Sequence, residues 1–101
     1  MDKVLSKNRR ISRDIMNQLV RASTSIGSNL EEAKAGQSKA DFHSKLRIAL
    51  KEAREAHYWL RLLAESGMIS RQRLAPLLQE ANEIVAILTT IAKKANPRNP
   101  I

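Results

Sequence analysis

The sequence predicts an all-α protein: an antiparallel up-down bundle of three long helices that assembles as an oligomer. Three observations support this prediction. Apolar residues recur at alternating spacings of three and four along three segments, which is the periodicity of a helix face. Gly and Ser residues separate these segments by short turns, so consecutive helices should run in opposite directions. The second and third segments also carry apolar residues off the main stripe, which indicates a second buried face.

The central segment, residues 38–66, organises the chain. Ser38 can cap its first turn, with Asp41 three residues later in a pattern related to the capping box, and Gly67 supplies a stop signal. No Gly or Pro interrupts the segment, and a helix about 40 Å long needs packed neighbours to be stable in water. Its apolar stripe is Phe42, Leu46, Ala49, Ala53, Ala56, Leu60 and Leu63.

The first helix is expected to begin near Lys3 or Ile11 and to end near Lys34. Its middle, residues 21–29, is rich in Ser, Thr and Gly, which are poor helix formers. Either these small residues let a neighbouring helix approach closely, or the helix bends at Gly27; we favour the close approach. Gly36 is expected to end the helix in the left-handed conformation. The stripe is Ile11, Ile15, Leu19, Ala22, Ile26, Leu30 and Ala33.

The third helix is expected to follow a cap at Ser70. Because Pro76 does not occupy the first helical position, the helix proper should begin near Ala75. Residues 1–95 are predicted to form one domain, and residues 96–101, which include Pro97 and Pro100, a disordered tail. The stripe is Leu74, Leu77, Ala81, Ile84, Leu88, Ile91 and Ala95.

The chain is strongly basic, with 18 Lys and Arg against 10 Asp and Glu, a net charge of +8. Such an excess favours polyanions such as RNA or DNA, although it can also serve solubility alone. The absence of Cys rules out disulfides and thiolate metal sites. Residues 1–10 lack the apolar region of a signal peptide and no apolar run is long enough to span a membrane, so we expect a cytoplasmic protein.

Basic residues crowd the first helix, and we take them as the candidate nucleic-acid site. Cations on the central helix have acidic neighbours at helical spacing, so we expect them to form solvated ion pairs instead. The expected pairs are Asp41 with Lys45, Lys51 with Glu55, and Arg61 with Glu65. The candidate nucleic-acid site comprises Lys3, Lys7, Arg9, Arg10, Arg13 and Arg21.

The apolar residues outside the main stripes predict a contact between copies of the chain. The alternative is that the two aromatic residues among them are core residues with only their polar edges in water. The predicted oligomer interface is Ile48, Tyr58, Trp59, Leu62 and Val85.

Little in the sequence indicates catalysis. His43 and His57 stand 14 residues apart, which places them about 21 Å apart along a helix and prevents a shared metal. No Gly-rich phosphate loop, His-Glu-x-x-His metal motif or nucleophile elbow occurs. We therefore expect no enzyme, no cofactor and no metal.

Residues 17–67 resemble the four-helix-bundle family named for the 23S rRNA intervening-sequence proteins, whose relatives include accessory proteins of diversity-generating retroelements. The resemblance extends over about residues 14–94, and Glu80-Ala81-Asn82-Glu83 fits the last helix of the family. The residues that carry it are Gln18-Leu19, Arg21-Ala22, Ser25-Ile26, Asn29, Glu32-Ala33, Ser38-Lys39-Ala40-Asp41-Phe42, Leu46, Ala49, Glu52-Ala53, Glu55-Ala56, Trp59-Leu60 and Leu63.

The resemblance implies a bundle that assembles as a ring, commonly a pentamer, with a basic surface or pore. In retroelement members that surface engages nucleic acid and a reverse transcriptase. Family members usually begin with one more amphipathic helix, which here is absent or reduced to residues 2–10. We therefore expect three helices, with the missing wall supplied by a partner.

The leading hypothesis is a non-enzymatic oligomeric accessory protein that binds RNA or DNA and assists a reverse transcriptase. The alternative is a protein-interaction adaptor or scaffold, in which the spare apolar face docks a partner polypeptide.

Overall fold

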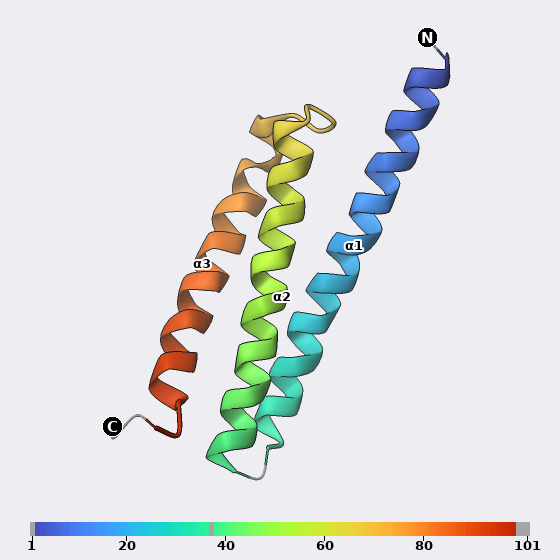
Figure 1. The fold of residues 1–101 in the computed structure, drawn as a ribbon. Helices are drawn as coiled ribbons and strands as arrows, with labels where there is room; N and C mark the ends of the chain where they lie inside the picture. The colour runs from blue at the N-terminus through green and yellow to red at the C-terminus, as the bar shows by residue number, and fades with distance from the viewer. Residues whose placement is uncertain (1, 37, 99–101) are drawn as a thin grey trace.

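The computed structural model describes residues 2–36 and 38–98, with side chains described from Arg9 onward. Three α-helices and no strands occupy these ranges: α1 (Asp2–Lys34), α2 (Lys39–Glu65) and α3 (Arg71–Ala95). The chain descends along α1, returns along α2 and descends again along α3 (Figure 1). The predicted all-α class and the three helices are confirmed. Residues 2–10 are the start of α1 and not a separate short helix.

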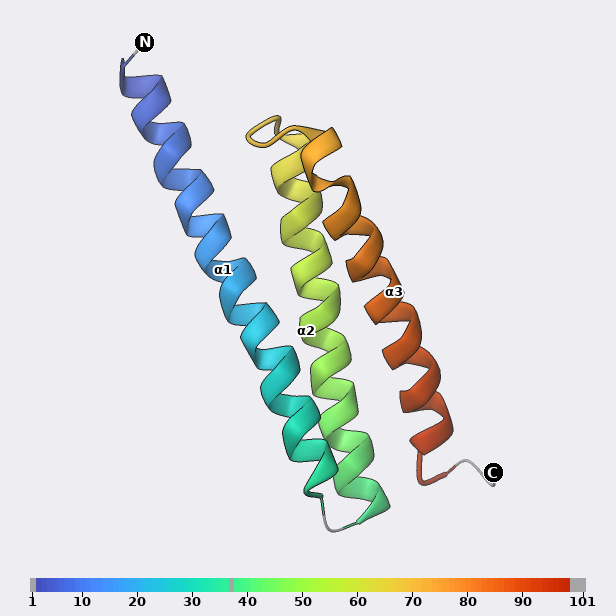
Figure 2. The ribbon, with the colours of Figure 1, turned by 180° about the vertical axis from the view of Figure 1, so that it is seen from behind.

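The middle position of α2 dominates the architecture. Both α1 and α3 pack against α2, and within the described part of the chain no Cα atom of α1 lies within 8 Å of a Cα atom of α3. Figures 1 and 2 show α2 between its two neighbours from opposite sides. The molecule measures 59 × 21 × 17 Å. It is thus an elongated layer of helices, with an opening between α1 and α3 along one side of α2.

Two apolar clusters join the helices along their length. One contains Ala33, Leu46 and Leu88 near the turn between α1 and α2. The other contains Ile15 and Leu60 near the opposite end. Small residues line α2 between the clusters, so the neighbouring helix axes can approach it closely. The predicted stripes supply nearly all of this core, which comprises Ile15, Ala22, Ala33, Leu46, Ala49, Ala53, Ala56, Leu60, Leu63, Ala64, Leu74, Leu88 and Ala92.

Two residues of the third predicted stripe are not buried. Leu77 is 49% exposed and Ile91 is 39% exposed, although both were expected in the core. The reason is that α1 and α3 do not meet, so the part of α3 that faces α1 has no partner. Met16 on α1 is exposed at the same opening.

The helix α1 continues without a break through its Ser- and Gly-rich middle. The hydroxyl of Thr24 donates to the carbonyl of Val20 at 2.8 Å, and the amide of Asn29 donates to the carbonyl of Ser25 at 2.8 Å. These side chains therefore bond back to their own helix. No atom lies within 4 Å of the position that a Cβ would take at Gly27. The close approach that we favoured is therefore not made at Gly27, although Ala22 of the same segment is fully buried.

The turn between α1 and α2 differs in one detail from the prediction. Gly36 does not adopt a positive φ. A Cβ at this position would lie 3.1 Å from the carbonyl oxygen of Ala33 and 3.4 Å from the amide nitrogen of Phe42. Close backbone approach, and not left-handed backbone, is what requires glycine here. Ser38 caps α2 as predicted, since its hydroxyl accepts a bond from the amide of Asp41 at 3.0 Å.

The turn between α2 and α3 contains the left-handed glycine, Gly67, with φ of 76°. Ser70 caps α3 as predicted and accepts from the amide of Arg73 at 3.2 Å. The helix begins directly after this cap, at Arg71, so the predicted start near Ala75 is wrong. Pro76 lies inside the helix, where the carbonyl of Gln72 loses its intrahelical partner. The cap and the packing of Leu74 outweigh that loss.

The predicted tail lies only partly within the described residues. Asn96 caps the end of α3, and its side chain accepts a bond from the amide of Arg98 at 3.0 Å. Residues 99–101 lie outside the described range.

We predict that Leu63→Ala lowers the free energy of unfolding by about 2–5 kcal/mol, because Leu63 is fully buried and its truncation leaves a cavity. Urea denaturation followed by helix circular dichroism, at one fixed protein concentration, measures the change. Gln79→Ala, at an exposed position on α3, is the control and should change stability by less than about 0.5 kcal/mol. Equal effects of the two substitutions would contradict this core assignment.

Candidate nucleic-acid interface

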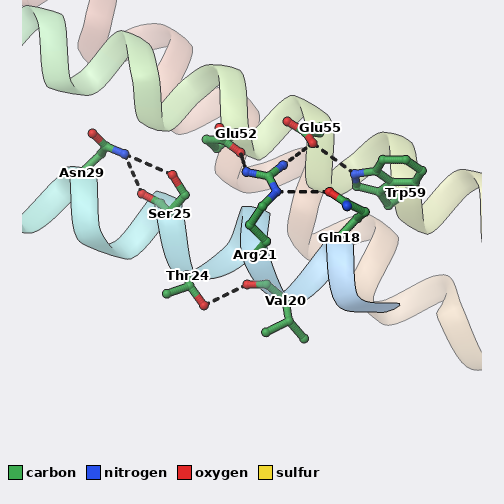
Figure 3. A network of polar contacts seen from close by, with 9 residues as sticks. All are labelled: Gln18, Val20, Arg21, Thr24, Ser25, Asn29, Glu52, Glu55 and Trp59. Atoms are coloured by element: carbon green, nitrogen blue, oxygen red, sulfur yellow. Dashed lines mark hydrogen bonds and ion pairs between the residues drawn. The ribbon is translucent and has the colours of Figure 1, made fainter. Parts of the chain in front are cut away.

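Arg21 joins α1 to α2 through a network of polar contacts (Figure 3). Its Nη1 donates to Glu52 Oε2 at 3.2 Å, its Nη2 pairs with Glu55 Oε1, and its Nε donates to Gln18 Oε1 at 3.1 Å. Trp59 Nε1 also donates to Glu55 Oε1, at 3.3 Å. Arg21 was predicted in the nucleic-acid site, but its charge is already met by two carboxylates of its own chain.

The network shifts the ionisation of its members. The hydrogen bond from Arg21 holds the pKa of the Glu55 carboxyl below its usual range, and burial offsets part of this effect. The same bond to Glu55 raises the pKa of Arg21. Both groups therefore remain charged at neutral pH. This corner of α1 and α2 is an electrostatic clasp between helices.

The other predicted site residues on α1 are differently placed. Arg9, Arg10 and Arg13 are exposed, and none forms an ion pair with a described residue. Arg9 and Arg13 line a hollow of about 630 Å³ between α1 and the α2–α3 turn. The side chains of Lys3 and Lys7 lie outside the described residues. Because three exposed arginines lie at or beside this hollow, the N-terminal half of α1 remains a candidate polyanion site.

The ion pairs expected within α2 do not form. Lys45 pairs with Glu32 of α1 at 2.7 Å, and Glu55 is held by Arg21. No pair joins Arg61 to Glu65 or Lys51 to a carboxylate in the described ranges. Two of the expected pairs are thus replaced by pairs with α1, because Lys45 and Glu55 lie on the flank of α2 that α1 packs against.

The consequence is a second set of cations without carboxylate partners. We name as the α2 basic stripe the exposed residues Arg47, Lys51, Arg54 and Arg61. Sequence reasoning missed this stripe because it assigned acidic partners from the same helix to two of its members, Lys51 and Arg61. The signal was present in the spacing, since the four residues recur at intervals of three, four and seven. Next to the stripe, burial and the charge of Arg61 lower the pKa of His57.

An apolar groove lies on the uncovered side of α2. Two adjoining hollows, of about 180 and 240 Å³, share Leu19, Leu60 and Leu77. The groove therefore runs between α1 and α3 with α2 as its floor. Its apolar lining comprises Met16, Leu19, Ile26, Ala53, Ala56, Leu60, Leu63, Ile69, Leu74, Leu77, Ala81 and Ile84.

The predicted interface residues lie elsewhere. Ile48 and Tyr58 are exposed, as an interface would need. Trp59 and Leu62 are half-buried against the cluster around Leu60, and Val85 is half-buried against the cluster around Leu88. Part of the apolar surface expected to remain open is thus covered by the chain's own helices, whereas the groove is open.

Two further statements, on a metal site and on a membrane span, concern the described residues only. They contain no gathering of three or more His, Cys, Asp or Glu side chains that could hold a metal ion. None of the helices combines the length and the apolar character that crossing a membrane requires.

Comparison with known proteins shows to which family the chain belongs. The model of the 23S rRNA-intervening sequence protein family matches residues 4–90, which is most of the chain. The chain belongs to this family.

A solved structure is also similar to this chain over most of its length. It is a protein with unknown function from the S23 ribosomal protein family of Bacteroides thetaiotaomicron. The two share 36% sequence identity, the match covers 91% of this chain and 96% of the other, and the TM-score is 0.71. No curated protein matches the chain. The resemblance inferred from the sequence is confirmed.

We predict that Arg21→Gln weakens the clasp between α1 and α2 in a pH-dependent way. The folded-state pKa of Glu55 is depressed, so its stabilising effect is present above the unfolded pKa of about 4.3 and is lost as pH falls through the folded value. The melting temperature of Arg21→Gln should lie below that of the wild type at pH 7, and the two should converge as pH falls below the folded-state pKa of Glu55.

The pKa of Glu55, measured by NMR titration, should rise in Arg21→Gln. Lys34→Gln is the control, because Lys34 pairs only with exposed Glu31 at 3.7 Å. An unchanged Glu55 titration would show that Arg21 does not hold this carboxylate in solution.

Proposed function

We propose that the chain is a non-enzymatic oligomeric accessory protein that binds nucleic acid, RNA above all, through its exposed arginines. The observation that carries this proposal is the set of cations without carboxylate partners, which includes Arg9, Arg10 and Arg13 on α1. The net charge of +8 supports it. Unpaired cations at a surface neutralise phosphates and release condensed counterions, so binding should be tight at low salt and weak at high salt.

The α1 site combines these arginines with a hollow. Arg9 and Arg13 lie one turn apart and border the same hollow beside the α2–α3 turn. The side chain of Arg10 follows on the same helical turn. Contacts of this kind bind phosphates without reading bases. We therefore expect little sequence preference at this site.

The apolar groove supports assembly from several copies. Exposed apolar side chains such as Met16 and Leu77 border it, and burying them against another copy would add to the core that one chain can form. A second copy is the occupant that we favour, because each copy carries the same open apolar face. Assembly as a ring, which the family resemblance suggests, would repeat the basic surface and strengthen its field.

The rival function is a protein-interaction adaptor, and the groove is also the observation that favours it. An amphipathic helix of another protein could lie between α1 and α3 and complete a four-helix bundle. Among such partners, the family resemblance suggests a reverse transcriptase. In this case the basic surface would be incidental.

We predict that the triple variant Arg9→Gln, Arg10→Gln and Arg13→Gln binds structured RNA more weakly than the wild type. Loss of three phosphate contacts should reduce the magnitude of the slope of log K against log salt by about 2–3. Fluorescence anisotropy with a labelled RNA hairpin across a salt series measures both quantities.

The matched control removes the same charge at the other end of the layer, through Lys34→Gln, Lys39→Gln and Lys94→Gln. It should retain most of the slope. Equal losses in the two triple variants would show that only total charge matters and would remove the α1 site.

We predict that Leu77→Asp lowers the oligomeric state, because a carboxylate in the groove cannot be buried against a second copy without a partner. Chromatography with light scattering measures the mass. Ile48→Asp is the comparison, since Ile48 is exposed on the interface predicted from the sequence. Dissociation by Ile48→Asp alone would place the contact there, and a monomeric wild type would favour the adaptor.

A further inference from the structure

The α2 basic stripe contains an aromatic residue in its middle. Arg47, Lys51, Arg54, Tyr58 and Arg61 follow one another at spacings of four, three, four and three. This spacing keeps all five on one side of α2. Arg47 and Arg61 are about 21 Å apart along the helix. The face is different from the groove, because Arg54 and Tyr58 lie more than a quarter turn around the helix from Ala53 and Ala56 on the groove floor.

The four cations of this face are available to a ligand. All are exposed, and none pairs with a carboxylate of the described residues. The nearby acid Glu55 is engaged by Arg21. At one end the stripe opens into a hollow of about 370 Å³ that is lined by His43, Arg47, Asn96, Pro97 and Arg98. The positive surface therefore continues beyond the helix itself.

Tyr58 is held as a platform between these cations. It is 47% exposed, and its ring meets the ring of Trp59 with centroids 5.1 Å apart and planes inclined at 64°. Trp59 is itself fixed by its bond to Glu55, which Arg21 holds. An exposed ring supported in this way can accept a stacked base at little entropic cost. Arg54 and Arg61 stand one turn before and one turn after it.

A single strand fits this face better than a duplex. A duplex hides its base faces in its own stack, and α2 cannot enter a groove because α1 and α3 flank it. A single strand offers both phosphates and free base faces, which cations and aromatic rings together bind. At about 3.4 Å per stacked nucleotide, 21 Å corresponds to about six nucleotides, within the usual site size.

We propose that the α2 basic stripe and Tyr58 form a binding site for single-stranded nucleic acid, with phosphates on Arg47, Lys51, Arg54 and Arg61 and a base stacked on Tyr58. The site rests on the proposed function in that its ligand is nucleic acid, but it uses none of the α1 arginines. It adds a second site and names the form of strand that it takes.

The test compares a labelled 12-nucleotide oligouridine with a labelled RNA duplex of the same length by fluorescence anisotropy across a salt series. Tyr58→Ala should weaken oligouridine binding by about tenfold, without a change in salt slope and without an effect on the duplex. Tyr58→Phe retains the ring and should bind within about twofold of the wild type. The stripe variant Arg47→Gln, Arg54→Gln and Arg61→Gln should reduce the slope for oligouridine by about 2, at about 0.7 for each contact.

The outcomes separate this proposal from the previous one. Binding of oligouridine that both Tyr58→Ala and the stripe variant leave unchanged overturns the α2 site, while the α1 site stands. Equal weakening of both ligands by Tyr58→Ala also overturns it, because a structural role for the ring would act that way. Wild-type protein that binds neither ligand at low salt overturns the proposed function and this site together. The stripe variant changes only exposed side chains and should remain folded. It therefore tests the α2 site even if Tyr58→Ala is too unstable for binding to be measured.

Discussion

The shared dependence of α1 and α3 on α2 is the constraint from which the rest of the structure follows. Each packs on α2, and the backbones of the two stay more than 8 Å apart between Cα atoms in the described residues. Alanines at 49, 53 and 56 make this possible, because they let two helix axes approach one surface. The arrangement leaves a groove between α1 and α3 along the apolar side of α2, and it leaves the basic side of α2 exposed. The groove is the surface proposed for assembly, and the basic side is the surface proposed for a single strand.

Much of the fold could be predicted from local pattern. Helices of this length with uninterrupted stripes and Ser caps are strongly specified, and Ser38, Ser70 and Gly67 act as expected. The failures have physical causes beyond local pattern. Leu77 has the periodicity of a core residue, yet its exposure depends on whether α1 reaches α3. Periodicity identifies the apolar face of a helix, but it does not identify which other element covers that face.

The candidate site was harder to predict, because ion pairing is decided between helices. Glu55 is four residues from Lys51, a spacing that permits a pair worth only a few tenths of a kcal/mol. Arg21 of α1 offers two bonds at once and a planar guanidinium, so it takes the carboxylate. One exchange of partners thus removes Arg21 from the nucleic-acid site and leaves Lys51 free. Without the helix arrangement, neither result can be read from spacing.

The position of Trp59 gives the molecule an intrinsic optical reporter. It is the chain's only tryptophan, and its indole nitrogen donates to the carboxylate that fastens α1 to α2. Its ring also touches the ring of Tyr58 on the outer face. Emission from a single fluorophore therefore senses both the separation of the first two helices and the occupancy of the surface beside it. Folding and ligand uptake can be followed in unlabelled protein from one signal.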